Sequence, residues 1–130
     1  MPMDRSLYPD NWDEIATQIK TEANWVCTDC GRPCRRSGES EYDLFQRLPS
    51  QWLVDWYETV DSEEFGEVDI EKPGRFILTV AHLNHRPEDC DRSNLKALCS
   101  VCHCRYDTTP TARFLKTQAA LERKGQLVLF

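Results

Sequence analysis

The most informative stretches of the sequence are CTDC at residues 27–30 and NLKALCSVCH at residues 94–103. Each stretch contains a CxxC pair. A CxxC turn places two thiolates on one side of a metal ion, so two such turns complete the tetrahedral shell that zinc prefers. We therefore expect one structural zinc ion, Zn²⁺, with four sulfur ligands. These ligands are Cys27, Cys30, Cys99 and Cys102.

The chain has seven cysteines, so three lie outside the two pairs. In a reducing compartment, paired CxxC spacing favours a metal site over disulfides. We expect Cys34, Cys90 and Cys104 to be free buried thiols, with Cys34 as an alternative fourth ligand. The long segment between the two pairs does not exclude a shared site, because the cost of loop closure grows only logarithmically with length.

The 130 residues predict a single domain, 1–130, in which a metal site would supplement a modest core. The net charge is -6, but residues 37–71 alone hold eleven acidic residues against one basic residue, Arg47. We therefore interpret about 37–74 as an acidic insertion between the two CxxC turns. We call these turns the zinc knuckles, the first at residues 25–36 and the second around Cys99 and Cys102. The insertion either solvates a surface or docks a protein partner, and it leaves a net positive remainder that a phosphate backbone could approach.

The sequence predicts a cytoplasmic protein with no membrane association. No stretch approaches the roughly 20 consecutive apolar residues that span a bilayer. The first residues also lack the basic and apolar regions of a signal peptide, because they include Asp4, Asp10 and Asp13.

Periodicity and turn residues predict an α+β chain. Apolar residues recur at helical spacing over 12–23, and Asn11 with Glu14 resembles a capping box. Ser40 and Asp43 indicate another helix start before Pro49. The remaining expected elements are a hairpin over 25–36, a short helix over 50–58, a turn or exposed hairpin loop over 61–74, a strand over 75–81, helices over 100–108 and 111–124, and an apolar tail over 127–130.

The first CxxC pair thus lies on a hairpin and the second at the start of a helix. This arrangement is that of a treble-clef zinc finger, and the helix N-terminus stabilises negative thiolates there. The expected fold is a small zinc-stapled treble-clef core with flanking helices.

The order of His82 at a strand end, Asn94 in a loop and His103 on a helix resembles the HNH endonuclease family, which has a ββα-metal centre. The resemblance covers roughly residues 25–36 and 75–108, and the pattern NLxxLCxxCH is specific. It implies a metal-dependent endonuclease that hydrolyses phosphodiester bonds of DNA.

The resemblance also implies catalytic roles. His82 would be the general base, and His103 would bind a catalytic divalent cation, Mg²⁺ or another ion. Asn94 would hydrogen-bond across the loop to hold the hairpin, or approach the metal. Such chemistry needs a base that deprotonates water and a cation that neutralises charge on the phosphate and the leaving oxygen.

One position departs from the family pattern. Many members place an acidic metal ligand directly before the base histidine, and here that residue is Ala81. An alternative register pairs Asn84 with His85, which makes His85 the base and His82 a ligand or structural residue. We favour His82 because it ends the strand. The candidates to replace the missing ligand are His85, Asn84, Asp89 and Asp91.

Basic residues surround the motif and could contact the DNA backbone, since arginine suits bidentate phosphate contacts. They are Arg86, Arg92, Lys96 and Arg105. The absent acid at Ala81 and the negative net charge favour a rival interpretation. In it, the chain is a non-catalytic zinc-stapled module that binds DNA or protein, or a subunit of a larger nucleoprotein assembly.

Overall fold

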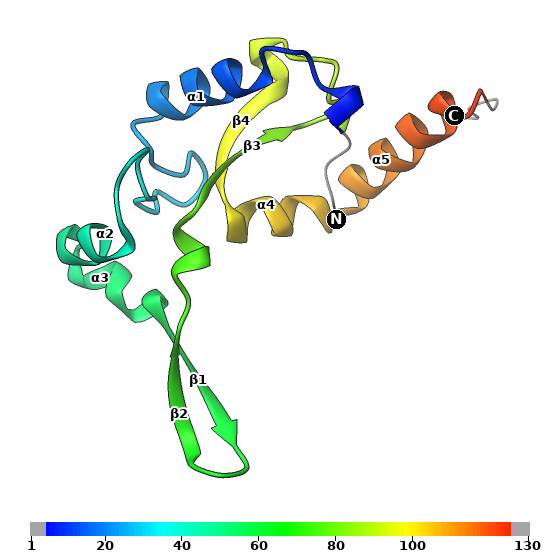
Figure 1. Cartoon of the computed structure of the whole chain (residues 1–130). Coiled ribbons are helices and arrows are strands. Elements are labelled where there is room, and N and C mark those ends of the chain that lie inside the picture. Colours follow the sequence, from blue (N-terminus) through cyan, green and yellow to red (C-terminus); the bar gives the residue numbers. More distant parts are fainter. Residues whose placement is uncertain (1–4, 126–130) are drawn as a thin grey trace.

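The computed structural model describes residues 5–125, which form a mixed α+β fold (Figure 1). Within this range the helices are α1 (Trp12–Glu22), α2 (Glu41–Arg47), α3 (Ser50–Leu53), α4 (Ser100–Asp107) and α5 (Pro110–Arg123). The strands are β1 (Tyr57–Ser62), β2 (Gly66–Glu71), β3 (Leu78–His82) and β4 (Leu95–Cys99). Short 3-10 turns occupy Arg5–Leu7, Val54–Trp56, Pro73–Phe76 and Arg92–Asn94.

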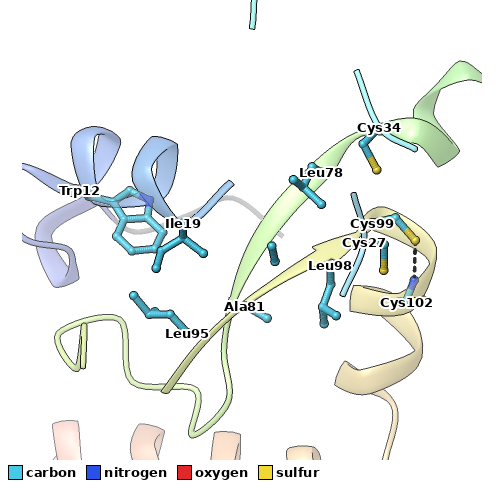
Figure 2. Close-up of a cluster of buried hydrophobic side chains, with 11 residues drawn as sticks. Trp12, Ile19, Cys27, Cys34, Leu78, Ala81, Leu95, Leu98, Cys99 and Cys102 are labelled. Atoms are coloured by element: carbon cyan, nitrogen blue, oxygen red, sulfur yellow. Dashed lines mark hydrogen bonds between the residues drawn. The ribbon is translucent and has the colours of Figure 1, made fainter. Parts of the chain in front are cut away.

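The antiparallel pair β3–β4 is the centre of the fold. Leu78 lies opposite Cys99 and His82 lies opposite Leu95. Helix α1 covers one face of this pair, and α4 follows β4 directly (Figure 1). Figure 2 shows the buried core running from Trp12 of α1 to the cysteines at the far end of the strands. Each large apolar side chain buried here contributes about 1.5–3 kcal/mol.

Helix α1 forms where the apolar spacing predicts it, but its N-terminus is not a capping box. Asn11 makes no side-chain cap hydrogen bond. Its carbonyl oxygen instead accepts from the backbone N–H groups of Glu14 and Ile15, each at 3.1 Å. Beyond the helix, Asn24 and Trp25 both have φ of 56°, and this left-handed pair turns the chain into the first knuckle.

The first knuckle is a tight turn, as expected for residues 25–36. Val26 bridges Pro33, and the Cys27 N–H donates to the Arg32 carbonyl at 3.0 Å. Gly31 has φ of 78°, which a residue without Cβ adopts at no steric cost. This turn places both cysteines of the first pair on one side.

The first half of the insertion forms a second small core. Ser40 accepts a hydrogen bond from the Asp43 N–H at 3.1 Å, which confirms the predicted start of α2. Arg32 of the first knuckle is buried against this core, with its guanidinium carbon 4.9 Å from the centre of the Phe76 ring. The buried apolar residues of this core are Leu44, Leu48, Trp56 and Phe76.

The second half of the insertion is a hairpin that points away from the rest of the molecule (Figure 1). The expected helix over 50–58 was too long, because helical structure ends at Trp56 and β1 begins at Tyr57. The hairpin loop expected over 61–74 is a paired β1–β2 ribbon, and Phe65 in its turn is 76% exposed.

The strand expected from residue 75 starts at Leu78. Pro73–Phe76 is a 3-10 turn, which turns the Phe76 side chain into the second core, where it is fully buried. Local propensity favours a strand at Phe76, but burial in this second core decides its conformation.

The two C-terminal helices agree closely with the prediction. Thr109 accepts from the Ala112 N–H at 3.2 Å and caps α5, and Pro110 occupies the first helical turn. Proline suits this position because its missing N–H would have no partner there. The apolar tail over 127–130 lies outside the described residues. Within the described range, none of the helices has the length and apolar character needed to cross a membrane.

Candidate metal and catalytic site

The four cysteines of the two CxxC pairs form one cluster. Their sulfur atoms all lie within 4.8 Å of one another, and the Sγ atoms of Cys30 and Cys99 are 3.7 Å apart. Cys99 ends β4 and caps α4, because its sulfur accepts from the Cys102 N–H at 3.4 Å (Figure 2). All seven cysteines are free thiols. The cluster could therefore hold a structural metal such as zinc.

Burial and backbone dipoles act on these sulfurs in opposite directions. Burial would raise the pKa of the Cys27 thiol, but backbone N–H groups of Cys30, Cys99 and Asp29 outweigh it and lower the pKa to about 7. Burial raises the pKa of Cys99 and of Cys102. One sulfur thus ionises readily, and the others become thiolates when a cation compensates their charge.

The other three cysteines have different surroundings. Cys34 is fully buried, and burial with the neighbouring sulfurs raises its pKa to about 12. It lies beside the cluster but is not one of its four members, so the alternative with Cys34 as ligand is not what the geometry favours. Cys90 is half-buried. Cys104 is exposed on α4, so the expectation of three buried thiols was wrong for this residue.

His82 lies in the core between β3 and α1. Its ring centroid is 4.8 Å from that of Trp12, and Tyr8 contacts it edge-on at 5.6 Å. The residue is 8% exposed, and burial lowers the pKa of its imidazole. Its Nε2 faces the Cys90 sulfur at 3.8 Å. His82 thus packs under α1, where little room remains for a phosphate.

His85 lies in the turn after β3, with φ of 58°. Its ring stacks parallel on Tyr106 of α4, with centroids 5.7 Å apart and 5° between the planes. Its Nε2 is buried, has no hydrogen-bond partner among the described residues, and lies 3.6 Å from Oδ1 of Asp107. Burial lowers the pKa of this imidazole. A buried nitrogen without a partner is costly, and such atoms mark candidate sites for a ligand.

His103 projects from α4 toward β3, and its hydrogen bonds fix its tautomer. The Thr79 hydroxyl donates its proton to the Leu98 carbonyl at 2.8 Å, so its oxygen must accept from Nδ1–H of His103 at 2.7 Å. In the neutral ring, Nε2 then carries a lone pair. This lone pair faces the second carboxylate oxygen of Asp107, Oδ2, at 3.7 Å.

The two histidines therefore share Asp107, with one carboxylate oxygen near each Nε2. A lone pair opposite a carboxylate oxygen is unfavourable unless a proton or cation lies between them. The ligand atoms of His85, His103 and Asp107, here called the histidine group, are nevertheless farther apart than the ligands of a bound metal ion. Within residues 5–125, only the four cysteines bring three or more ligand atoms within 4.8 Å of one another.

Asn94 holds the loop that carries His85. Its side-chain amide donates to Asn84 Oδ1 and to the Asp89 carbonyl, both at 2.9 Å. Its oxygen accepts from the Asn84 backbone N–H at 3.0 Å. These bonds have the pattern expected for a residue that ties the loop to the strand.

Three of the four candidates for the missing ligand are occupied within the same loop. Asn84 Oδ1 accepts from Asn94 and Arg86, and Asn84 Nδ2 donates to Asp89 at 2.8 Å. Asp91 caps the following turn through Ser93. Of the four, His85 alone points to the carboxylate shared with His103.

Most of the basic residues expected to contact DNA have carboxylate partners. Arg86 pairs with Glu122, Arg92 with Glu22, and Lys96 with Asp29. Arg105 is exposed on α4 and has no carboxylate partner among the described residues. A phosphate backbone would thus compete with existing ion pairs at three of these four positions.

Asp107 is the residue that the sequence reasoning missed. The sequence does place Asp107 near His103, because Asp107 follows it by four residues and residues with this spacing share one face of a helix. The candidates predicted from the sequence all lie near Ala81, upstream of the second CxxC pair, and so do not include Asp107.

Comparison with protein-family models, with curated proteins and with solved structures gives no match for this chain. The geometry described above therefore carries the functional argument alone.

Proposed function

We propose that the chain is a metal-dependent endonuclease of HNH type, with a treble-clef zinc site as its frame, that hydrolyses phosphodiester bonds of DNA. The observation that carries the proposal is the placement of His85 and His103 around the two carboxylate oxygens of Asp107. This placement favours the register in which His85, and not His82, is the base.

The residues present fit a divalent cation. His103 offers an Nε2 lone pair, and its other nitrogen donates to Thr79, as metal-binding histidines commonly donate to a neighbouring acceptor. Asp107 offers a carboxylate oxygen on the same side. Asp107 would thus replace the acidic ligand that the sequence lacks at Ala81. Imidazole and carboxylate ligands suit Mn²⁺ and Ni²⁺, and the carboxylate suits Mg²⁺.

In this mechanism His85 is the general base. The negative charge of Asp107 Oδ1, 3.6 Å from Nε2, favours the tautomer with the proton on Nε2, so Nδ1 takes the proton from water. The water oxygen bonds to phosphorus, and the bond between phosphorus and the leaving oxygen breaks. A cation held by His103 and Asp107 would supply positive charge that stabilises the phosphate and the leaving oxygen. Asn94 positions the loop that carries the base.

A plasmid-nicking assay tests this assignment with zinc-loaded protein and added Mg²⁺, Mn²⁺ or Ni²⁺. His85→Ala should lower the rate by about 10²- to 10⁴-fold, because general-base catalysis contributes that much. The matched control is His82→Phe, which keeps an aromatic ring under Trp12. This control should retain activity, and both variants should retain zinc. Full activity in His85→Ala with loss in His82→Phe would contradict the assignment.

A non-catalytic zinc-stapled binding module is the second candidate. The ion pairs of Arg86, Arg92 and Lys96 favour it, as does the acidic hairpin β1–β2, which stands apart and exposes Phe65. Such a hairpin would dock a basic protein surface, as in a nucleoprotein assembly. An absence of nicking by the wild type with all three cations would support this module.

A further inference from the structure

A hollow of about 600 Å³ lies between α1 and the segment that leaves the first knuckle, away from the histidine group. Residues of α1, of 35–39 and of the start of β3 line it. The hollow lies on the face of β3 that α1 covers. His103 reaches β3 from the opposite side, because it extends from α4 to contact Thr79. Its size is that of a small-ligand site, which is commonly 300–1,000 Å³.

Three cations line this hollow in a chain whose net charge is -6: Lys20, Arg35 and Arg36. Its one acidic residue, Glu39, is already neutralised. Its carboxylate binds Arg47 through two hydrogen bonds of 2.6 and 2.8 Å, and this contact holds its pKa at about 2. The Arg35 and Arg36 side chains are exposed and form no ion pair within the described part of the chain. The positive charge of the hollow is therefore available to an anion.

The apolar wall of the hollow is formed by Trp25 and Ile77, and Ile77 is 46% exposed. Lys20 lies over the Trp25 ring, with its ammonium nitrogen 5.9 Å from the centroid. This stacking holds the ammonium at the rim of the hollow. Trp25 itself has φ of 56°, a left-handed conformation that is unfavourable for a non-glycine residue.

The backbone of Trp25 is fixed in this conformation from both sides. Its N–H donates to the Lys20 carbonyl at 3.0 Å, and its carbonyl accepts from Cys34 N–H at 2.9 Å. The backbone that carries the ring is thus held between α1 and the first knuckle. Positive charge above an apolar wall suits a ligand that carries a phosphate next to a flat or apolar group, which is the chemistry of a nucleotide.

We propose that this hollow is a second binding site, for a nucleotide phosphate with its adjoining sugar or base. Arg35 and Arg36 bind the phosphate oxygens, Lys20 adds charge at the rim, and Trp25 with Ile77 contacts the apolar part. The ligand is either a free mononucleotide or one unit of a nucleic-acid strand. The site does not depend on the proposed cleavage, because binding here needs neither His85 nor a catalytic cation.

Fluorescence anisotropy with a labelled single-stranded DNA tests the site, using zinc-loaded protein without added divalent cation so that no cleavage occurs. A labelled adenosine monophosphate is the second probe. The test variant is Arg35→Ala/Arg36→Ala. The matched control, Lys72→Ala/Lys124→Ala, removes the same charge from the hairpin base and the end of α5. Zinc content and circular dichroism of each variant check the fold.

The test variant should bind at least one of the two probes ten-fold or more weakly than the wild type, and the control should stay within about three-fold. Loss for the strand alone identifies a strand unit as the ligand, and equal loss for both probes identifies a mononucleotide site. Equal binding by the test variant and the wild type, or equal weakening in the control, would overturn the proposal. Nicking activity decides none of these outcomes.

Discussion

At the scale of single residues, strand alternation separates the histidines. Successive side chains of a strand point to opposite faces. Thr79 of β3 therefore faces α4 and holds His103, while His82, three residues later, faces α1 and packs under Trp12. Strand alternation does not determine the side on which His85 lies, because His85 follows the strand. Its left-handed backbone turns the ring back onto Tyr106.

The Thr79 hydroxyl is predicted to position His103 for its proposed role as a metal ligand. Thr79→Val keeps the shape but removes the oxygen that accepts from Nδ1–H of His103. Outer-shell partners of this kind change metal affinity or activity about 10- to 100-fold, so nicking should fall by that factor. The cation concentration at half-maximal rate should rise in the same assay.

Thr79→Ser restores the hydroxyl and is the control for this experiment. It should nick within about three-fold of the wild type, and both variants should retain zinc. Wild-type kinetics in Thr79→Val would show that the hydrogen bond does not matter to the site.

Sequence reasoning predicted some of these residues and not others, for physical reasons. The four cysteines and Asn94 were predictable, because a CxxC turn fixes its own geometry and Asn94 acts on the adjacent loop. The sequence could not show where the rings of His82 and His85 lie, because that depends on the packing of α1 on β3 and on the turn after β3. Asp107 was detectable from helical spacing alone.

At the scale of elements, one ion pair fastens α2 to the first knuckle. Arg47 of α2 binds Glu39 through two hydrogen bonds and also donates to the Cys34 carbonyl at 2.9 Å. Both side chains are largely buried, at 28% and 12% exposure. Hydrogen bonds to charged groups at such positions contribute about 1.5–3 kcal/mol.

Glu39→Gln should therefore lower the free energy of unfolding by about 1–2 kcal/mol at neutral pH. The folded-state pKa of Glu39, about 2, lies below the value in the unfolded chain. The stabilisation is therefore fully present above the unfolded-state value and is lost as pH falls toward the folded-state value. The difference between variant and wild type should be constant from about pH 8 to 5.5 and shrink below about pH 5.

Urea unfolding at a series of pH values measures this difference. Glu63→Gln in the hairpin turn is the control, because Glu63 has no ion-pair partner within residues 5–125, and its cost should stay near zero. A cost for Glu39→Gln that varies between pH 6 and 8 would assign the effect to another titrating group.

The predicted boundaries of helices and strands agree with the structure where local contacts determine them. α1, α4 and α5 begin within a residue of the prediction, because apolar spacing and local capping set them. The start of β3 and the end of the helical turn before β1 were misplaced. Both are set by Phe76 and Trp56, which enter a core built from distant segments.

In the molecule as a whole, the acidic hairpin is separated in space from the two proposed metal sites. The acidic hairpin β1–β2 points away from β3, β4 and α4, as Figure 1 shows. The net charge of -6 therefore does not describe the surface near the histidines or the basic hollow. Separation of this kind lets an acidic chain present local sites to a phosphate.

The proposed function requires two cation sites in one fold, one of four sulfurs and one at His103 and Asp107. Anomalous diffraction from crystals of the zinc-loaded protein grown with manganese tests it most directly. We expect a zinc peak among the four cysteine sulfurs and a manganese peak between Nε2 of His103 and Oδ2 of Asp107. A zinc peak among the sulfurs with no manganese peak at His103 would contradict it.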